Sequence, residues 1–168
     1  MIYKNNDIQI NFTDTTKKGV TGTTIQTVLG VIPISANTFQ NYDTFFVEGL
    51  FVSSATSATL RIYVNTGQTV TSSATQIMIR GVSSGLVTQI QERTINIIKS
   101  DGNVSEVSPD IGTNFAASGT GIVTDFRSTT ATIASIDWTK DNYIFFTAAL
   151  GLGATNYIDQ YYIKVWTE

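Results

Sequence analysis

Cysteine and histidine are both absent from the 168 residues of this chain. Without a thiol or an imidazole, the chain cannot build Ser-His-Asp or Cys-His catalytic centres, disulfides or the usual zinc sites. A chain without thiols also carries no mark of the redox compartment in which it folds. Calcium could still bind oxygen ligands such as Asp101, Asp110 and Asp125, but the ligand spacing of a dedicated calcium loop is missing. We therefore expect no metal and no cofactor.

Charged residues are scarce as well. Asp, Glu, Lys and Arg make up 14% of the chain, whereas roughly 25% is typical of soluble globular proteins. The formal net charge is -3, and the ten basic residues are scattered along the sequence. Because nucleic-acid binding needs clustered Lys and Arg, we expect no nucleic-acid partner. Ser, Thr, Asn and Gly supply the polarity instead, which suits pleated strands and turns.

Long apolar runs are missing too. No stretch approaches the roughly 20 apolar residues that a membrane-spanning helix needs, so we expect no membrane insertion. The first residues, MIYKNNDIQINFTD, lack the basic start and continuous apolar segment of a secretory signal peptide. These features predict a protein that is made and first used inside a cell. A length of 168 residues is enough for one domain with its own hydrophobic core.

Short strands dominate what is present. The last quarter of the chain has three segments rich in β-branched and aromatic residues, at 130–136, 143–150 and 157–167, each bounded by Asp, Asn, Lys or Gly. Comparable segments occur at 25–34, 44–53, 60–65, 76–80, 92–99, 104–107 and 122–126, and a Gly- and Ser-containing loop is expected at 108–121. About nine or ten strands without intervening helices predict an all-β fold, either an antiparallel β-sandwich or a barrel.

Residues 1–24 differ from the rest of the chain. They are polar and contain the turn-like sequence TDTTKKG, although Ile8, Ile10 and Phe12 alternate as in a short strand. Two alternatives follow. This segment is either a peripheral strand of the domain or an arm that docks on a partner. Residues 25–168 then form the β-sandwich domain.

Two of the predicted strands are apolar on both faces. In 143–150, Tyr143 and Phe145 lie on one face and Ile144 and Phe146 on the other, because side chains alternate along a strand. The segment 44–53 shows the same pattern. An antiparallel sandwich strand usually exposes one face to water. We therefore predict that a second copy of the chain covers the other face.

Four segments carry a resemblance to a known family. They are LRIYVN at 60–65 with the Gly/Ser/Thr loop that follows it, RTINI at 93–97, DNYIF at 141–145 and YYIKV at 161–165. Their layout resembles the TNF-like jelly-roll domains of bacteriophage fibre, appendage and capsid-decoration proteins, over residues 25–168. The chain departs from complete fibres because it has no coiled-coil or collagen-like shaft. That departure favours a capsid decoration, head fibre, or tail or neck appendage.

The resemblance implies a jelly-roll β-sandwich that forms a homotrimer on a virion assembled in the host cytoplasm. It implies that the N-terminal arm contacts other virion proteins and that distal loops are free to contact a host receptor or surface glycan. It implies no catalysis. The alternative function is a monomeric carbohydrate-binding β-sandwich module that uses aromatic residues on loops.

The position of each aromatic residue, on a strand or on a loop, decides which of these two roles we expect for it. Residues within strands are expected to pack at a subunit interface, and this set comprises Phe45, Phe46, Tyr143, Phe145, Tyr161 and Ile163. Aromatic residues on loops are the better candidates for glycan contact, and this set comprises Tyr42, Phe115 and Trp138.

Acidic residues offer the one catalytic arrangement that the composition still permits. Asp137 and Asp141 flank Trp138, as paired carboxylates do in some glycan-cleaving sites. The structural interpretation is a turn in which the two Asp side chains cap backbone groups, and turn preferences favour it. Glu48 interrupts an apolar strand, so it either pairs with Arg61 or Arg80 or points to water. We expect the protein not to be an enzyme.

Overall fold

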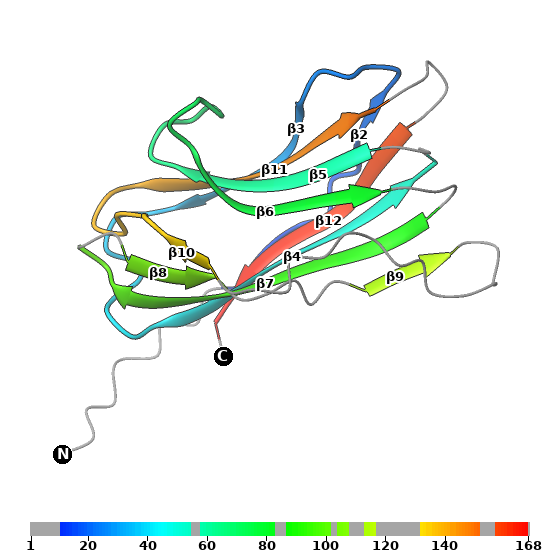
Figure 1. Cartoon of the computed structure of the whole chain (residues 1–168). Coiled ribbons are helices and arrows are strands. Elements are labelled where there is room, and N and C mark those ends of the chain that lie inside the picture. Colours follow the sequence, from blue (N-terminus) through cyan, green and yellow to red (C-terminus); the bar gives the residue numbers. More distant parts are fainter. Residues whose placement is uncertain are drawn as a thin grey trace.

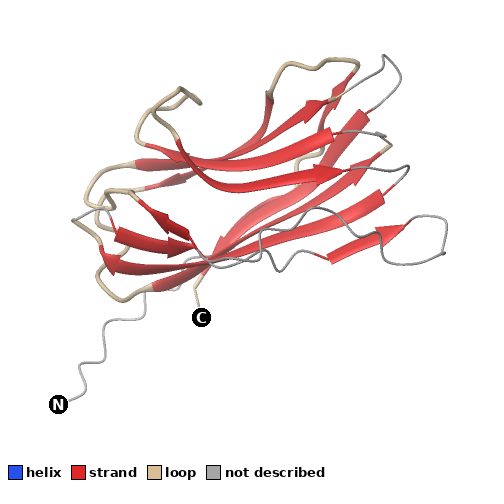
Figure 2. Ribbon diagram, in the orientation of Figure 1, coloured by secondary structure: helices blue, strands red, loops and turns tan. Residues whose placement is uncertain are grey.

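The computed structural model describes residues 11–54, 58–82, 87–101, 104–107, 113–116, 132–151 and 157–167. These residues form strands joined by turns and loops, without a helix among them (Figure 2). The strands are β1 (Asn11–Asp14), β2 (Lys18–Thr21), β3 (Thr27–Ile34), β4 (Thr44–Ser53), β5 (Ala58–Asn65), β6 (Thr75–Val82), β7 (Val87–Lys99), β8 (Val104–Val107), β9 (Thr113–Ala116), β10 (Thr132–Ala134), β11 (Asn142–Leu150) and β12 (Tyr157–Trp166).

Two antiparallel sheets pack face to face (Figure 1). The smaller sheet has the order β3-β11-β5-β6. The larger sheet has the order β1-β12-β4-β7-β8-β10, and in addition β2 pairs with β12 and β9 pairs with β7. Strands that follow one another in sequence thus repeatedly cross from one sheet to the other, as β3 to β4 and β11 to β12 do. This is the double Greek-key connectivity of a jelly roll, so the predicted fold class is confirmed.

The predicted strand bounds agree closely with the structure in the centre of the domain. The segments 44–53 and 104–107 coincide with β4 and β8. The described residues contain twelve strands rather than about nine or ten. One of the unpredicted strands is β9, within the expected loop 108–121, where it pairs with the first residues of β7. The predicted strand at 122–126 lies outside the described residues.

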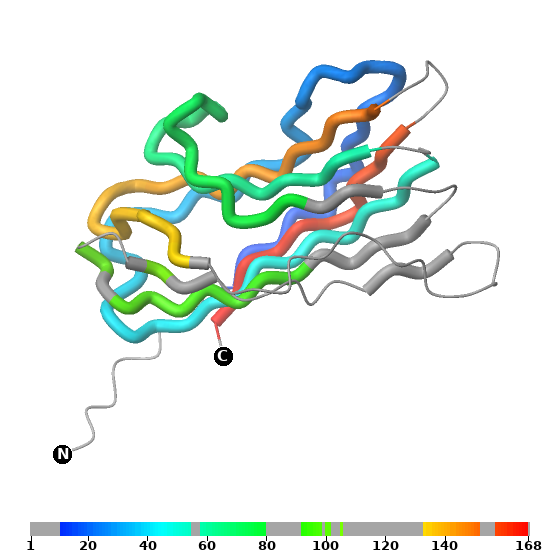
Figure 3. The backbone as a smooth tube through the Cα atoms, in the orientation of Figure 1, coloured from blue at the N-terminus to red at the C-terminus, as the bar shows by residue number. Residues whose placement is uncertain are grey.

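The N-terminal segment joins the larger sheet. β1 pairs with the end of β12 and β2 with its beginning, so the blue and red ends of the tube run side by side in Figure 3. Val20 is buried in the core, and Phe12 packs against it. Two short strands within residues 11–21 therefore belong to the larger sheet. The first ten residues lie outside the described part of the chain.

The core lies between the sheets and follows the alternation of each strand. In β5, Leu60, Ile62 and Val64 are buried while the residues between them are partly exposed. In β4, Gly49 stands where a side chain would strike the ring of Phe51, since a Cβ there would lie 2.7 Å from that ring. Glycine at this inward position therefore lets the large apolar side chains of the two sheets approach one another.

The two apolar faces of β11 do not need a second copy of the chain. Phe146 is 0% exposed and Phe145 is 1% exposed within a single chain. Phe146 belongs to the core cluster between the sheets, whereas Phe145 lies on the opposite face, as the alternation requires. The prediction that a second copy covers Phe145 is therefore wrong. Other residues of the same chain cover it instead.

Candidate functional site

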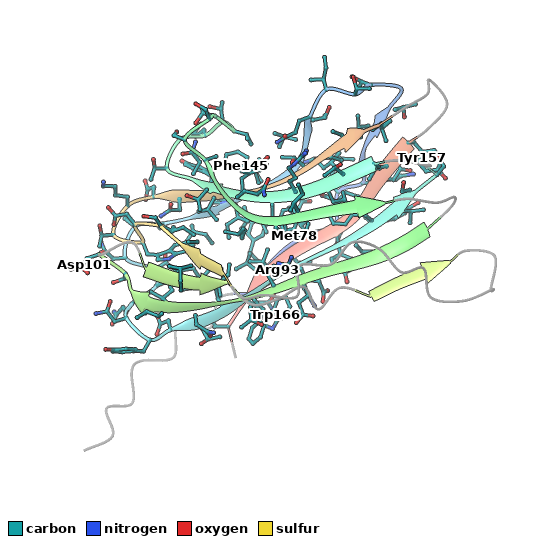
Figure 4. All side chains as sticks on the ribbon, viewed as in Figure 1. Met78, Arg93, Asp101, Phe145, Tyr157 and Trp166 are labelled. Carbon is teal, nitrogen blue, oxygen red and sulfur yellow. The ribbon has the colours of Figure 1, made fainter. Side chains whose placement is uncertain are left out.

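A groove lies on the outer face of the smaller sheet. Its volume is about 810 Å³, within the range of roughly 300–1,000 Å³ found for ligand-binding sites. Its described lining comprises Gln26, Val28, Val31, Tyr63, Gln68, Thr69, Val70, Thr71, Ser72, Ala74 and Phe145. Figure 4 places Phe145 on this sheet, near the loop between β5 and β6, with Met78 and Arg93 lying between the sheets.

Three strands form the base of the groove. Phe145 in β11 lies opposite Val31 in β3 and opposite Tyr63 in β5, so these three residues make one cross-strand row. Since Ile62 and Val64 point into the core, alternation turns Tyr63 outward. Phe145 sits at the bottom, because its neighbours leave it 1% exposed, while Tyr63 stays half-buried and reachable.

The loop at 66–74 forms one wall. Asn65 Nδ2 donates to the carbonyl of Thr69 over 2.8 Å, and the backbone N–H of Ala74 donates to the carbonyl of Thr71 over 3.0 Å. The hydroxyls of Thr71 and Ser73 lie 2.7 Å apart. These local hydrogen bonds hold the loop in a defined shape above the sheet, as Ser, Thr and Asn side chains commonly do in turns.

Two hydrogen bonds between glutamine and tyrosine cross the groove region. The hydroxyl of Tyr63 donates to Gln26 Oε1 over 3.4 Å. Gln68 Nε2 donates to the hydroxyl of Tyr143 over 3.1 Å, and the ring of Tyr143 lies 6.4 Å from that of Phe145. Each pair joins a segment at the rim to a strand of the sheet.

The described lining of the groove is uncharged. Its polar groups are amides and hydroxyls. The exposed apolar surface comes from Val28, which is 43% exposed, with Val31 and Tyr63 beside it. Such a lining can hold an uncharged ligand that has both C–H faces and hydroxyl groups. It offers no carboxylate to transfer protons.

A cluster of charged residues lies on the opposite side of the molecule from the groove, on the outer face of the larger sheet. Lys164, Glu48 and Glu92 face one another across β12, β4 and β7. Lys164 Nζ lies 2.9 Å from Glu48 Oε1, and the Tyr162 hydroxyl donates to the same oxygen over 2.6 Å. Arg61 is not the partner of Glu48, because it belongs to the smaller sheet, and the side chain of Arg80 lies outside the described residues.

Burial shapes the protonation of this cluster. Desolvation raises the pKa of Glu92, and the neighbouring charge of Glu48 raises it further. Desolvation also raises the pKa of Tyr162 above its ordinary value, helped by the hydrogen bond to Glu48. Lys164 additionally lies 4.2 Å above the ring of Trp166. With Glu48 only 8% exposed and held by two partners, the cluster ties three strands together.

The residues predicted to contact glycans are dispersed. Trp138 is 1% exposed, packs edge-on against Phe39 and Phe45, and donates from Nε1 to Ser105 Oγ over 2.9 Å. It therefore has no surface for a glycan, and that expectation is wrong for Trp138. Tyr42 is 85% exposed and is not among the residues that line the groove. The side chain of Phe115 lies outside the described residues.

The residues predicted at a subunit interface fall into two groups. Phe45, Phe145 and Ile163 are buried within one chain, so they have no free surface for a second copy to cover. Phe46, Tyr143 and Tyr161 keep exposed surface. Phe46 stacks on Trp166 with 5.1 Å between ring centres, and Tyr161 is 40% exposed at a bulge of β12.

Asp137 caps the turn that contains it, and Asp141 binds the backbone of the loop after β3. Asp137 Oδ1 accepts from the backbone N–H of Thr139, and Asp137 Oδ2 lies 3.1 Å from Lys140 Nζ. Asp141 accepts from the backbone N–H of Ala36 over 2.8 Å. These contacts agree with the turn interpretation rather than with a pair of catalytic acids.

The described residues contain no group of three or more Asp or Glu side chains that could hold a metal ion. They also contain no helix with the length and apolar character to cross a membrane.

The sequence did not point to Gln26, Tyr63 and Gln68 as site residues. One signal was available: Tyr63 stands between two inward residues of LRIYVN, so alternation alone places it on the outer face. Nothing in the sequence indicated that Gln26 and Gln68, 42 positions apart in numbering, come to the same groove.

No protein-family model matches the chain, and no curated protein matches it. Among solved structures, peanut lectin with a 9mer peptide has a TM-score of 0.47 at 9% identity, covering 95% of this chain and 97% of that one. The Lotus tetragonolobus seed lectin has a TM-score of 0.40 at 14% identity, covering 99% and 96%. The CBM2 module of the evolved Dit of Lactobacillus casei BL23 phage J-1 has a TM-score of 0.38 at 6% identity, covering 82% and 67%. At such values the likeness carries no conclusion about what this chain binds.

Proposed function

We propose that this chain is a non-enzymatic carbohydrate-binding jelly-roll domain whose site is the groove on the smaller sheet. The observation that carries the proposal is the uncharged lining of an 810 Å³ groove with Tyr63 reachable on its floor. An aromatic ring can lie against the C–H face of a sugar, and flanking amides and hydroxyls can bond its hydroxyl groups. Because the described lining has no carboxylate, binding without cleavage is the function that fits.

A binding experiment with matched tyrosine variants tests this proposal. The purified full chain is applied to an array of bacterial and plant polysaccharides, and binding is quantified by titration calorimetry. Tyr63→Ala should weaken binding by roughly fivefold or more, since the aromatic contact contributes about 1 kcal/mol or more. Tyr42→Ala is the control because Tyr42 is equally aromatic, 85% exposed and outside the groove. Equal loss in both variants, or no binding by the wild-type chain, would overturn the proposal.

The setting that we propose for this domain is the surface of a phage particle assembled in the host cytoplasm. Support comes from the resemblance of its sequence segments to phage jelly-roll proteins, together with the jelly-roll strand order that the resemblance implies. In this setting the domain is a structural subunit of a capsid decoration, fibre or appendage that contacts a surface glycan. The segment before β1 is then the part that contacts other virion proteins.

A homotrimer belongs to the same proposal. It is supported by Phe46 and Trp166, two partly exposed aromatic residues on the outer face of the larger sheet. Aromatic surface of this kind suits a subunit contact, and it lies on the side opposite the groove. An assembly through that side would leave the groove open. Light scattering of the purified chain should give three times the monomer mass of 18.2 kDa, and Phe46→Lys should give the monomer mass. A monomer mass for the wild-type chain at micromolar concentration would overturn the trimer proposal.

A further inference from the structure

The groove has chemistry that selects among carbohydrates. Gln26 and Gln68 stand at its rim on opposite sides of the row that contains Phe145, and each is held by a tyrosine. Gln26 comes from the segment before β3, and Gln68 from the loop between β5 and β6. The two amides therefore belong to segments whose relative position is fixed by the sheet.

Each amide has more hydrogen-bonding capacity than its tyrosine uses. A glutamine side chain has one carbonyl oxygen with two lone pairs and two N–H donors. Tyr63 occupies one lone pair of Gln26, and Tyr143 occupies one donor of Gln68. An amide also presents a donor and an acceptor side by side, which matches two neighbouring hydroxyl groups on a sugar ring. The tyrosine bonds orient the amides before a ligand arrives, which lowers the entropy cost of binding.

The lining disfavours an acidic sugar. A carboxylate or sulfate in a partly enclosed site needs a cationic partner, because removing an unpaired charge from water is costly. The described lining offers neither Lys nor Arg, and the whole chain carries a net charge of -3. The volume of about 810 Å³ belongs to the upper part of the range for ligand sites. This is more space than one sugar ring fills.

We propose that the ligand is an uncharged oligosaccharide of several sugar units, recognised through the amides of Gln26 and Gln68. This inference rests on the proposed carbohydrate-binding function. It adds the charge and the size class of the ligand, and it names the two residues that form hydrogen bonds with the ligand's hydroxyl groups.

The test uses defined sugars as probes. Cellohexaose, maltohexaose, mannohexaose and galactohexaose represent neutral chains, glucose, mannose and galactose represent single units, and hexagalacturonate represents an acidic chain. Titration calorimetry with the full-length protein should show binding of at least one neutral hexamer. The matching single sugar and hexagalacturonate should bind at least roughly tenfold more weakly. Binding of hexagalacturonate or of a single sugar as tightly as the best neutral hexamer would overturn the inference.

Variants test the two amides. Gln68→Leu and Gln26→Leu keep the approximate size but remove the amide, so each should weaken hexamer binding by roughly tenfold, the loss of about one hydrogen bond. Gln76→Leu is the control, because Gln76 is exposed on β6 and absent from the lining. If Gln68→Leu fails to fold, Gln68→Glu retains a polar side chain and should still weaken binding.

The outcomes separate the two proposals. If wild type binds a neutral hexamer and Tyr63→Ala loses binding while both Leu variants retain it, the groove binds carbohydrate but the amides do not read it. If wild type binds none of the hexamers but binds an acidic polysaccharide on the array, the carbohydrate-binding function stands and the ligand class named here is wrong. If nothing binds in either experiment, both proposals fail.

Discussion

Phe145 and Phe146 are consecutive residues of β11 that point to opposite faces of the same sheet, and both are buried within a single chain. Phe146 faces the core, and Phe145 lies at the bottom of the outer groove, beside Val31 and Tyr63. Burial on both faces of a sandwich strand is unusual. Here the outer cover is part of the chain itself, which makes the groove a built feature of the domain.

Replacing Phe145 should therefore destabilise the isolated chain. Phe145→Ala is expected to lower the free energy of unfolding by about 3–5 kcal/mol, as for other buried phenylalanines. Urea unfolding followed by fluorescence measures this, and the loss should not depend on protein concentration. Phe46→Ala is the comparison, since Phe46 is only half-buried and should cost less. If the loss for Phe145→Ala disappears on dilution, a second copy of the chain buries Phe145 after all.

Trp138→Phe should cost stability without affecting ligand binding. The substitution removes the indole N–H that donates to Ser105 and leaves that hydroxyl, 0% exposed, without this partner. The expected loss is about 1–3 kcal/mol. A second substitution, Ser105→Ala, should recover part of the loss, because the stranded hydroxyl is then gone. Reduced binding of carbohydrate by a folded Trp138→Phe protein would show that Trp138 takes part in the site.

Gly49→Ala should destabilise the domain by overpacking. The new Cβ would lie 2.7 Å and 2.8 Å from two ring atoms of Phe51 and 3.2 Å from the ring of Phe146. Aromatic rings cannot shift without disturbing the core, so a loss of about 1–3 kcal/mol is expected. Gly67→Ala is the control, because its Cβ would meet nothing closer than 3.5 Å. Thermal unfolding of both variants makes the comparison, and equal stability would contradict the packing described for β4.

Gln160→Met should stabilise the protein. Gln160 is 0% exposed, and neither its Oε1 nor its Nε2 has a hydrogen-bond partner among the described residues. Methionine is similar in shape and removes both polar atoms, so a gain of about 1–3 kcal/mol is expected. Gln76→Met, at an exposed position, should change stability by less than about 0.5 kcal/mol. Destabilisation by Gln160→Met in urea unfolding would mean that the buried amide is satisfied.

Glu92 should make stability depend on pH. Its pKa is raised above the ordinary value of 4.5 by burial first and by Glu48 second, so the folded chain binds its proton more tightly than the unfolded chain. The stability that this proton contributes is fully present below an unfolded-state pKa near 4.5 and is lost as the pH rises through the folded-state value.

Glu92→Gln tests that pH dependence, because glutamine stays uncharged at every pH. The variant should gain stability over wild type at neutral pH, and the gain should shrink as the pH falls toward 4.5. Urea midpoints of both proteins at several pH values measure it. Asp14, whose pKa is lowered mainly by its hydrogen bonds to Thr16, is present in both proteins and so does not affect the difference. Parallel pH profiles would contradict the raised pKa.

The amino-acid sequence by itself determined the fold class and most strand positions. Alternation of side chains is a local property with a period of two residues, so it predicted the inward residues of β5 and the bounds of β4 without knowledge of their neighbours. The polar turns and the scarcity of helix signals predicted the sandwich. Both results depend on residues that are close together in the chain.

Only the tertiary structure decided which partners these strands bring together. The register across β12, β4 and β7 places Glu48 beside Lys164, and the loop after β5 returns to line the same groove as Phe145. Trp138 lies in the core, where its ring packs against Phe39 and Phe45 and its N–H donates to Ser105, 33 positions away. Such contacts join residues far apart in sequence. Strand order and register decide which of these residues meet, and no local sequence pattern specifies either.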